Sequence, residues 1–159
     1  GAQAIYNNDA SNLADYGRLY NWYAVDDSRG LCPSDWHIPT DGEFMTLEME
    51  LGMSESEANG TGWRGTDQGA QMKSSPEDSP SWDGTNTSGF SAVAVGYQTN
   101  LGWTSGDTKF YTSTFEAGPD TNVPVNATVR MLAGVSWVGR FNSGLFGYGS
   151  VRCLKDTEE

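Results

Sequence analysis

Apolar and polar positions divide the chain into one early apolar run, one amphipathic segment and a series of short alternating runs. Residues 18–25 (RLYNWYAV) place large side chains on both faces of an extended chain, a pattern typical of a largely buried strand. Later runs combine alternation with β-branched and aromatic residues, and we expect a strand in each of them: residues 89–97, 109–115, 129–137 and 150–154.

One segment carries helix signals at both of its ends. Thr40 and Glu43 have the spacing of a capping box, in which the side chain of each accepts a hydrogen bond from the backbone amide of the other. Gly52 is a natural end for such a helix. The apolar positions on one face are Phe44, Leu47 and Leu51. We expect a helix over residues 41–51 that covers a core, and a second, short helix near residues 68–74.

Residues 54–88 interrupt these patterns, and we expect ordered but irregular loops there. Trp63 and Trp82 lie in this region as either packing anchors or stacking platforms, and we favour packing for both. The order of a strand, a helix, loops and several short strands predicts an α+β fold rather than repeated βαβ units. At 159 residues the chain is long enough to bury a core, so we expect a single domain over residues 1–159.

Charge separates the last quarter of the chain from the rest. The formal net charge is −12, yet residues 121–155 contain no Asp or Glu and carry four cations: Arg130, Arg140, Arg152 and Lys155. That segment is therefore +4, and the remainder is −16 (−12 minus +4). So acidic a chain argues against nonspecific binding to nucleic acid or to an anionic membrane surface. No apolar run reaches the roughly 18 residues of a membrane span, so we expect no membrane insertion.

Within this segment, residues 133–148 (AGVSWVGRFNSGLFGY) space large side chains with Gly, Ser and Asn. A surface selected only for solubility would carry acids in such a protein, so their absence favours an exposed, specialised segment, although complete burial would exclude acids too. Aromatic residues and Arg dominate the energy of protein interfaces, and Gly and Ser give binding loops their adaptability. We therefore expect a ligand-binding face made of Trp103, Tyr111, Val135, Trp137, Arg140, Phe141, Asn142, Leu145, Phe146 and Tyr148.

Catalytic and metal-binding chemistry has few candidates. The one histidine, His37, lies between Trp36 and the helix cap, where we expect a structural role. Cys32 and Cys153 form no Cys-x-x-Cys pair, which argues against a zinc site. They are either two free buried thiols or a disulfide, which would stabilise the fold by about 4–5 kcal/mol through loop closure. We expect no enzyme activity, no cofactor and no metal.

Four segments together resemble one protein family: residues 20–25 (YNWYAV), 31–44 (LCPSDWHIPTDGEF), 85–92 (TNTSGFSA) and 150–156 (SVRCLKD). Over residues 17–156 the chain resembles the Fibrobacter succinogenes major paralogous domain, which is usual in bacterial surface and secreted proteins and is grouped with C-type-lectin-like folds. The resemblance implies a small antiparallel sheet, one or two helices and long irregular loops. It also implies a disulfide between Cys32 and Cys153, which leaves no cysteine for catalysis.

The chain is also similar to C-type-lectin-like variable proteins, whose C-terminal codons are rewritten by diversity-generating retroelements. This second resemblance implies a non-catalytic module that displays residues 133–148 to a protein or glycan on another cell, from an extracellular, cell-surface or virion-surface location. One alternative is a structural or adhesive domain of a bacterial surface protein or fibre, in which residues 133–148 would be mostly buried. Another is a calcium-dependent glycan binder. The acidic loops at residues 26–27 and 77–78 are candidates for structural calcium, with solvated surface charge as the alternative.

Overall fold

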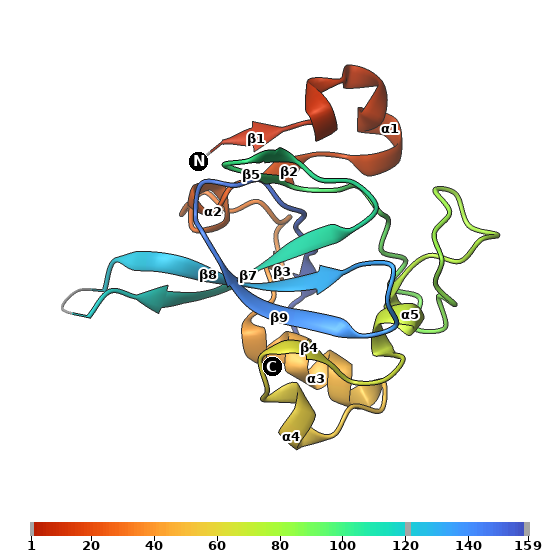
Figure 1. The fold of residues 1–159 in the computed structure, drawn as a ribbon. Coiled ribbons are helices and arrows are strands. Elements are labelled where there is room, and N and C mark those ends of the chain that lie inside the picture. The colour runs from red at the N-terminus through yellow and green to blue at the C-terminus, as the bar shows by residue number, and fades with distance from the viewer. Residues whose placement is uncertain (1, 120–121, 158–159) are drawn as a thin grey trace.

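A computed structural model describes residues 2–119 and 122–157. Over these residues the chain has an α+β fold around a four-stranded antiparallel sheet in the order β4–β9–β8–β7 (Figure 1). Its strands are β4 (Gly62–Arg64), β7 (Thr108–Ala117), β8 (Pro124–Leu132) and β9 (Val138–Ser143). The smaller antiparallel pairs are β1 (Gln3–Ala4) with β2 (Leu19–Tyr20), β3 (Trp36–His37) with β10 (Leu154–Lys155), and β5 (Gln98–Thr99) with β6 (Gly102–Trp103). The expected α+β class with small antiparallel sheets is confirmed.

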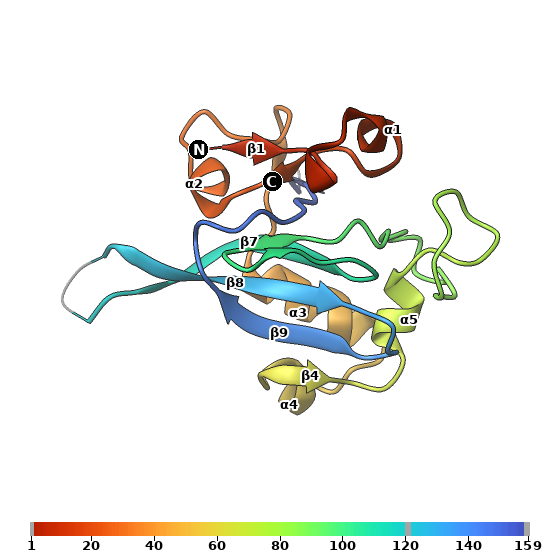
Figure 2. The ribbon, with the colours of Figure 1, turned by 45° about the horizontal axis from the view of Figure 1, so that its top comes forward.

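Helical segments lie on both sides of the sheet (Figure 2). One side carries α3 (Asp41–Glu50), α4 (Glu55–Ala58) and α5 (Gln68–Met72). The other side carries 3-10 turns at Tyr6–Asn8 and Ala10–Asn12, then α1 (Leu13–Tyr16) and α2 (Trp22–Val25). None of the helices in the described ranges is long and apolar enough to cross a membrane.

The longest helix, α3, confirms the expectation for residues 41–51. Thr40 and Glu43 form the capping box, and the helix ends with Leu51 as its C-cap. Phe44 is buried on the inner face, as its spacing predicts. The second expected helix is also present, as α5 within residues 68–74.

The strand expected over residues 18–25 is wrong beyond Tyr20. The Asn21 side chain accepts a hydrogen bond from the Ala24 amide and so caps the one-turn helix α2. Trp22, Ala24 and Val25 are buried because α2 packs against the sheet, whereas Tyr23 is 43 % exposed. A side chain that caps a helix thus overrides the apolar pattern of a strand.

Of the other four expected strands, one is confirmed, because residues 109–115 lie in β7. The other three differ from the structure. The strand expected over residues 129–137 ends at Leu132 in β8, so residues 133–137 form a connection. Residues 89–97 join no ladder, and Ala92 instead bridges Lys73. Of residues 150–154, only the last belongs to a named strand, β10.

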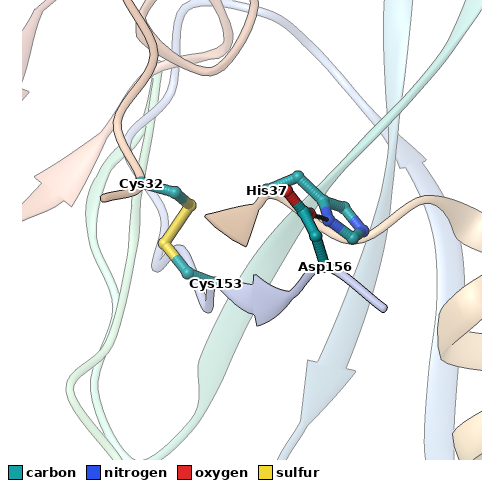
Figure 3. Close-up of a disulfide and its surroundings, with 4 residues drawn as sticks. All are labelled: Cys32, His37, Cys153 and Asp156. Carbon is teal, nitrogen blue, oxygen red and sulfur yellow. Dashed lines mark hydrogen bonds and ion pairs between the residues drawn. A yellow bond between two sulfur atoms is a disulfide. The ribbon is translucent and has the colours of Figure 1, made fainter. Parts of the chain in front are cut away.

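The sheet separates two hydrophobic cores. The core on the α3 side contains Phe44, Met53, Ala58, Met72, Ala92, Phe110, Leu132 and Val138, with Trp82 packed against it as expected. The core on the α2 side contains Trp22, Val25, Ile38, Tyr111, Ala127, Val129 and Leu145. Cys32 adjoins this second core and forms a disulfide with Cys153, 121 residues later, with the Cα atoms 5.7 Å apart (Figure 3). The disulfide implied by the family resemblance is therefore present.

Candidate binding face beside β4

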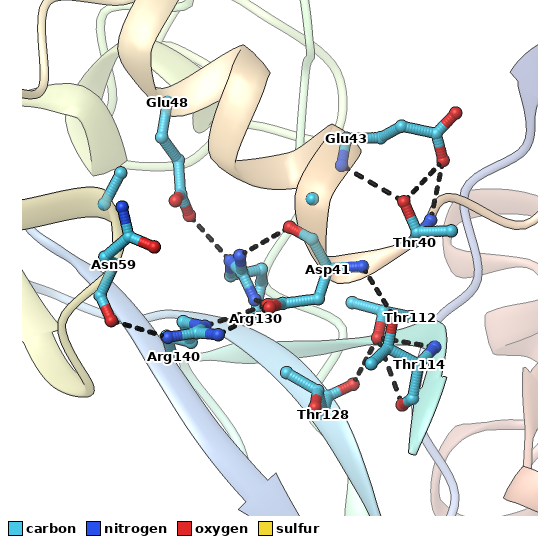
Figure 4. Close-up of polar contacts among 12 residues, drawn as sticks. Thr40, Asp41, Glu43, Glu48, Asn59, Thr112, Thr114, Thr128, Arg130 and Arg140 are labelled. Carbon is cyan, nitrogen blue, oxygen red and sulfur yellow. Dashed lines mark hydrogen bonds and ion pairs between the residues drawn. The ribbon is translucent and has the colours of Figure 1, made fainter. Parts of the chain in front are cut away.

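A buried ion-pair network links α3 to the central sheet (Figure 4). Glu48 is fully buried and accepts two hydrogen bonds from Arg64, each 2.9 Å long, and one of 2.7 Å from Arg130 Nε. Arg130 is also fully buried and donates to Asp41 Oδ1 at 2.6 Å. A buried charge is tolerated only when it is paired and hydrogen-bonded, and each member of this network has such partners.

Arg140 extends the network to the surface. Its Nε and Nη2 donate to the Asp41 carboxylate at 2.9 and 2.5 Å, and its Nη1 donates to the carbonyls of Asn59 and Gly60 at 2.8 and 3.2 Å. Burial would raise the pKa of Asp41, but the hydrogen bonds from Arg140 and Arg130 outweigh it and lower that pKa. These contacts fix β9 and the connection between α4 and β4 relative to α3.

The network explains part of the acid-free segment. Arg130 and Arg140 belong to that segment, and the acids that neutralise them, Asp41 and Glu48, lie in α3. Two of the four positive charges counted along residues 121–155 are therefore compensated inside the fold.

Two open hollows lie next to the edge strand β4. One, of about 440 Å³, is lined by Glu57, Gly60, Trp63, Arg64, Gly65 and Trp137. The other, of about 570 Å³, is lined by Thr61, Gly62, Thr128, Arg140, Phe141 and Asn142. We call these two sets of residues together the β4 face. Four of the expected ligand-binding residues thus meet there: Trp137, Arg140, Phe141 and Asn142.

The β4 face carries three aromatic rings, those of Trp63, Trp137 and Phe141. Trp63 and Trp137 are 41 % and 46 % exposed. Trp63 meets Phe141 edge to face, with ring centroids 5.7 Å apart and an interplanar angle of 77°. The Trp137 backbone approaches α5 so closely that a Cβ on Gly69 would lie 2.2 Å from the Trp137 carbonyl oxygen. The half-exposed indole of Trp137 is therefore carried on closely packed backbone.

A family model described as the Fibrobacter succinogenes major domain matches residues 1–155. The chain belongs to this family. The match includes the whole β4 face and begins earlier than the residues 17–156 on which the resemblance rests. No curated protein and no solved structure matches the chain.

Two residues expected to contact a ligand are buried in this Fibrobacter succinogenes major domain. Tyr111 is 0 % and Leu145 7 % exposed, so neither presents its side chain to a partner. The Tyr111 hydroxyl donates to the carbonyls of Gly144 and Gly147 at 3.1 and 2.8 Å and supports the connection after β9. Alternation along β7 turns Tyr111 toward the α2-side core, and this orientation replaces the expected surface role.

The other expected residues lie outside the β4 face. Phe146 is 78 % exposed and contacts Tyr23 of α2, with ring centroids 5.4 Å apart. Trp103, in β6, packs edge to face against Tyr6 at 5.4 Å. Tyr148 is half-buried, and its carbonyl accepts a hydrogen bond from the Gln98 amide. Val135 is 38 % exposed on the connection before β9.

A buried lysine packs against the connection after β9, so closely that a Cβ on Gly149 would lie 2.9 Å from Lys109 Cε. Lys109 is 2 % exposed, and its Nζ lies 5.0 and 4.8 Å from the ring centroids of Tyr97 and Tyr111. Burial lowers the pKa of Lys109 to about 8 and raises that of Tyr111 to about 12.

His37 joins the end of the chain to α3. Its Nδ1 lies 2.5 Å from Asp156 Oδ1 (Figure 3). Its Nε2 lies 2.9 Å from Glu43 Oε1. These hydrogen bonds, that of Asp156 first, raise the pKa of His37. Across residues 2–119 and 122–157, no three His, Cys, Asp or Glu side chains are grouped as a metal site would require.

Sequence patterns missed part of the β4 face. Trp63 is half-exposed, which suits the alternative role of a stacking platform better than the packing role that we favoured. Thr61 and Thr128 carry no distinguishing signal, because a threonine in a loop or strand is usual on any surface. They join the face because β4 and β8 both flank β9, a pairing of distant segments that local patterns do not encode.

Proposed function

We propose that this domain is a non-catalytic binding module that contacts a protein or glycan through the β4 face. The observation that carries the proposal is the pair of half-exposed indoles, Trp63 and Trp137, beside backbone fixed by the Glu48–Arg130–Asp41 network. Rigid aromatic groups gain contact area while losing little conformational entropy, and so favour tight contacts.

The polar residues of the β4 face suit a role in orientation. Thr61, Thr128 and Asn142 place hydroxyl and amide groups in the same hollow as the Phe141 ring. An apolar surface with a few convergent polar groups is the usual composition of a recognition site. Arg140 already donates to Asp41, Asn59 and Gly60, so we assign it to the fixed wall of the hollow rather than to a free cationic contact.

The proposal also covers the scaffold of the domain, the diversification of its sequence and its location. We propose a C-type-lectin-like scaffold, in keeping with small antiparallel sheets and the disulfide, and diversification of residues 133–148 by a retroelement. The disulfide favours an oxidising location, such as the cell exterior, a cell surface or a virion surface. The partner would then be a protein or glycan on another cell.

Exposure favours binding over a purely structural or adhesive role. The structural alternative requires residues 133–148 to be mostly buried, whereas Trp137 and Phe146 are 46 % and 78 % exposed. The calcium-dependent alternative stays a prediction, which a calcium titration of thermal stability and glycan binding would test.

Selection of ligands on the purified domain tests the proposal. The domain is screened against an array of oligosaccharides and a phage-displayed random peptide library. A double variant, Trp63→Ala with Trp137→Ala, is screened in parallel. We expect selected ligands to lose at least tenfold in affinity on the double variant, about 1.4 kcal/mol or more. Ligands that bind the wild type and the double variant equally would refute the β4 face as the site.

A further inference from the structure

Arg152 differs from the other arginines of the acid-free segment. Arg130 and Arg140 both bind carboxylates of α3, whereas Arg152 is partly buried and, within the described part of the chain, has no carboxylate or hydrogen-bond acceptor as partner. Its guanidinium lies over the Phe90 ring, 4.3 Å from the centroid. Burial lowers the pKa of Arg152 below its ordinary value. A guanidinium held in this way has its donors free for an anion.

The Phe90 ring and Arg152 border a hollow of about 320 Å³, outside the β4 face. Its walls are mostly apolar and come from α3, from the loop before residue 92 and from the C-terminal segment. The apolar wall residues are Pro39, Phe44, Leu47, Phe90 and Leu154. A cavity of this size has room for one amino-acid side chain and a small polar group.

The other polar side chains at this hollow are already engaged. Glu43 Oε1 contacts His37 at 2.9 Å, and Glu43 Oε2 accepts from the Thr40 amide at 2.8 Å and from its hydroxyl at 2.9 Å. Ser88 donates to the Gln71 carbonyl at 2.7 Å. Arg152 is therefore the lining side chain that can offer hydrogen bonds to an incoming anion without giving up an existing one.

We propose that this hollow binds the C-terminal residue of a peptide, with its carboxylate on Arg152 and its apolar side chain against Phe90 and Leu47. A planar guanidinium matches a carboxylate through two parallel hydrogen bonds, and stacking on Phe90 holds the guanidinium in place for them. A single negative charge suits the site better than several, because Glu43 also lines the hollow and the chain is strongly acidic.

Nuclear magnetic resonance titration of the intact chain tests this site, with the Arg152 Nε–H signal as the readout. The probes are N-acetyl-leucine and its amide, which differ only in the carboxylate, and N-acetyl-glycine, which lacks the side chain. We expect saturable shifts with N-acetyl-leucine, at least tenfold weaker binding of N-acetyl-glycine, and no saturable shift with the amide. Arg152→Gln should abolish binding of N-acetyl-leucine, whereas Arg18→Gln, at an exposed arginine, should leave it unchanged.

Equal binding of the acid and its amide, or no saturable shift with N-acetyl-leucine, would overturn the proposal. These outcomes come from the wild-type chain, so they hold even if Arg152→Gln does not fold. Binding of N-acetyl-leucine but not of a longer peptide ending in leucine would also overturn it, because the site would then take free acids rather than peptide ends.

Discussion

The two connections on either side of β9 are alike in composition. Residues 133–137 and 144–149 both lack acids, both contain glycine, and both carry one exposed aromatic residue, Trp137 and Phe146. Buried side chains hold the backbone of each. In the first connection, residues 133–137, Lys73 donates to the carbonyls of Ala133 and Val135 at 2.8 and 3.1 Å. In the second connection, residues 144–149, Tyr111 donates to two carbonyls in a similar way.

The two connections differ in what surrounds their aromatic residue. Trp137 lies beside Trp63 in a hollow next to the edge strand, whereas Phe146 projects to 78 % exposure and contacts only the Tyr23 ring among aromatic groups of the described residues. Amino-acid composition does not distinguish residues 133–137 from residues 144–149. It is the pairing of β4 with β9 that gathers aromatic and polar groups at one of them, so tertiary structure separates a candidate site from an exposed residue.

Removing the charge of Glu48 should weaken both connections at once. Glu48 binds Arg64 of β4 and Arg130 of β8, the two strands that flank β9, and β9 joins the two connections. Glu48→Gln leaves Arg64 without a carboxylate partner and Arg130 with Asp41 alone, and we expect a loss of about 3–5 kcal/mol in the free energy of unfolding. Urea denaturation measures it. The control is Glu50→Gln, at an exposed position of the same helix. A loss below about 1 kcal/mol would show that the network does not support β9.

Lys109, which packs against residues 144–149, should make the free energy of unfolding depend on pH. Its folded pKa is about 8, below the unfolded value of 10.5, so the unfolded chain binds more protons between these values. Stability should therefore rise from pH 8 to pH 10, by about 2–3 kcal/mol at 1.4 kcal/mol per unit. Urea titrations at several pH values check this.

Lys109→Met should flatten that rise, while Lys155→Met, at an exposed lysine, should not. A profile for Lys109→Met that matches the wild type would remove Lys109 as the cause.

Tyr111→Phe should separate the two connections. The change deletes the hydroxyl that two carbonyls share, and we expect a loss of about 1–2 kcal/mol. Hydrogen exchange should become faster in residues 144–149 and stay unchanged in residues 133–137. Faster exchange in both segments would contradict independent support of the two connections.

Local signals predicted the parts of this fold that local contacts build. The capping box of Thr40 and Glu43 is complete within four residues, and α3 forms as expected. The disulfide came from the family resemblance, not from spacing. Asn21 was missed as a helix cap because it lies inside an apolar run. The burial of Glu48 depends on Arg64 and Arg130, 16 and 82 residues away, and no local pattern contains that information.

The most direct test of the β4 face compares Trp137→Ala with Phe146→Ala. Both changes truncate an exposed ring of the acid-free segment, so we expect less than about 1 kcal/mol of stability change in either. Isothermal titration of a ligand selected on the wild type should show at least tenfold weaker binding to Trp137→Ala and unchanged binding to Phe146→Ala. Weaker binding to Phe146→Ala with full affinity for Trp137→Ala would contradict the account and move the site to the second connection.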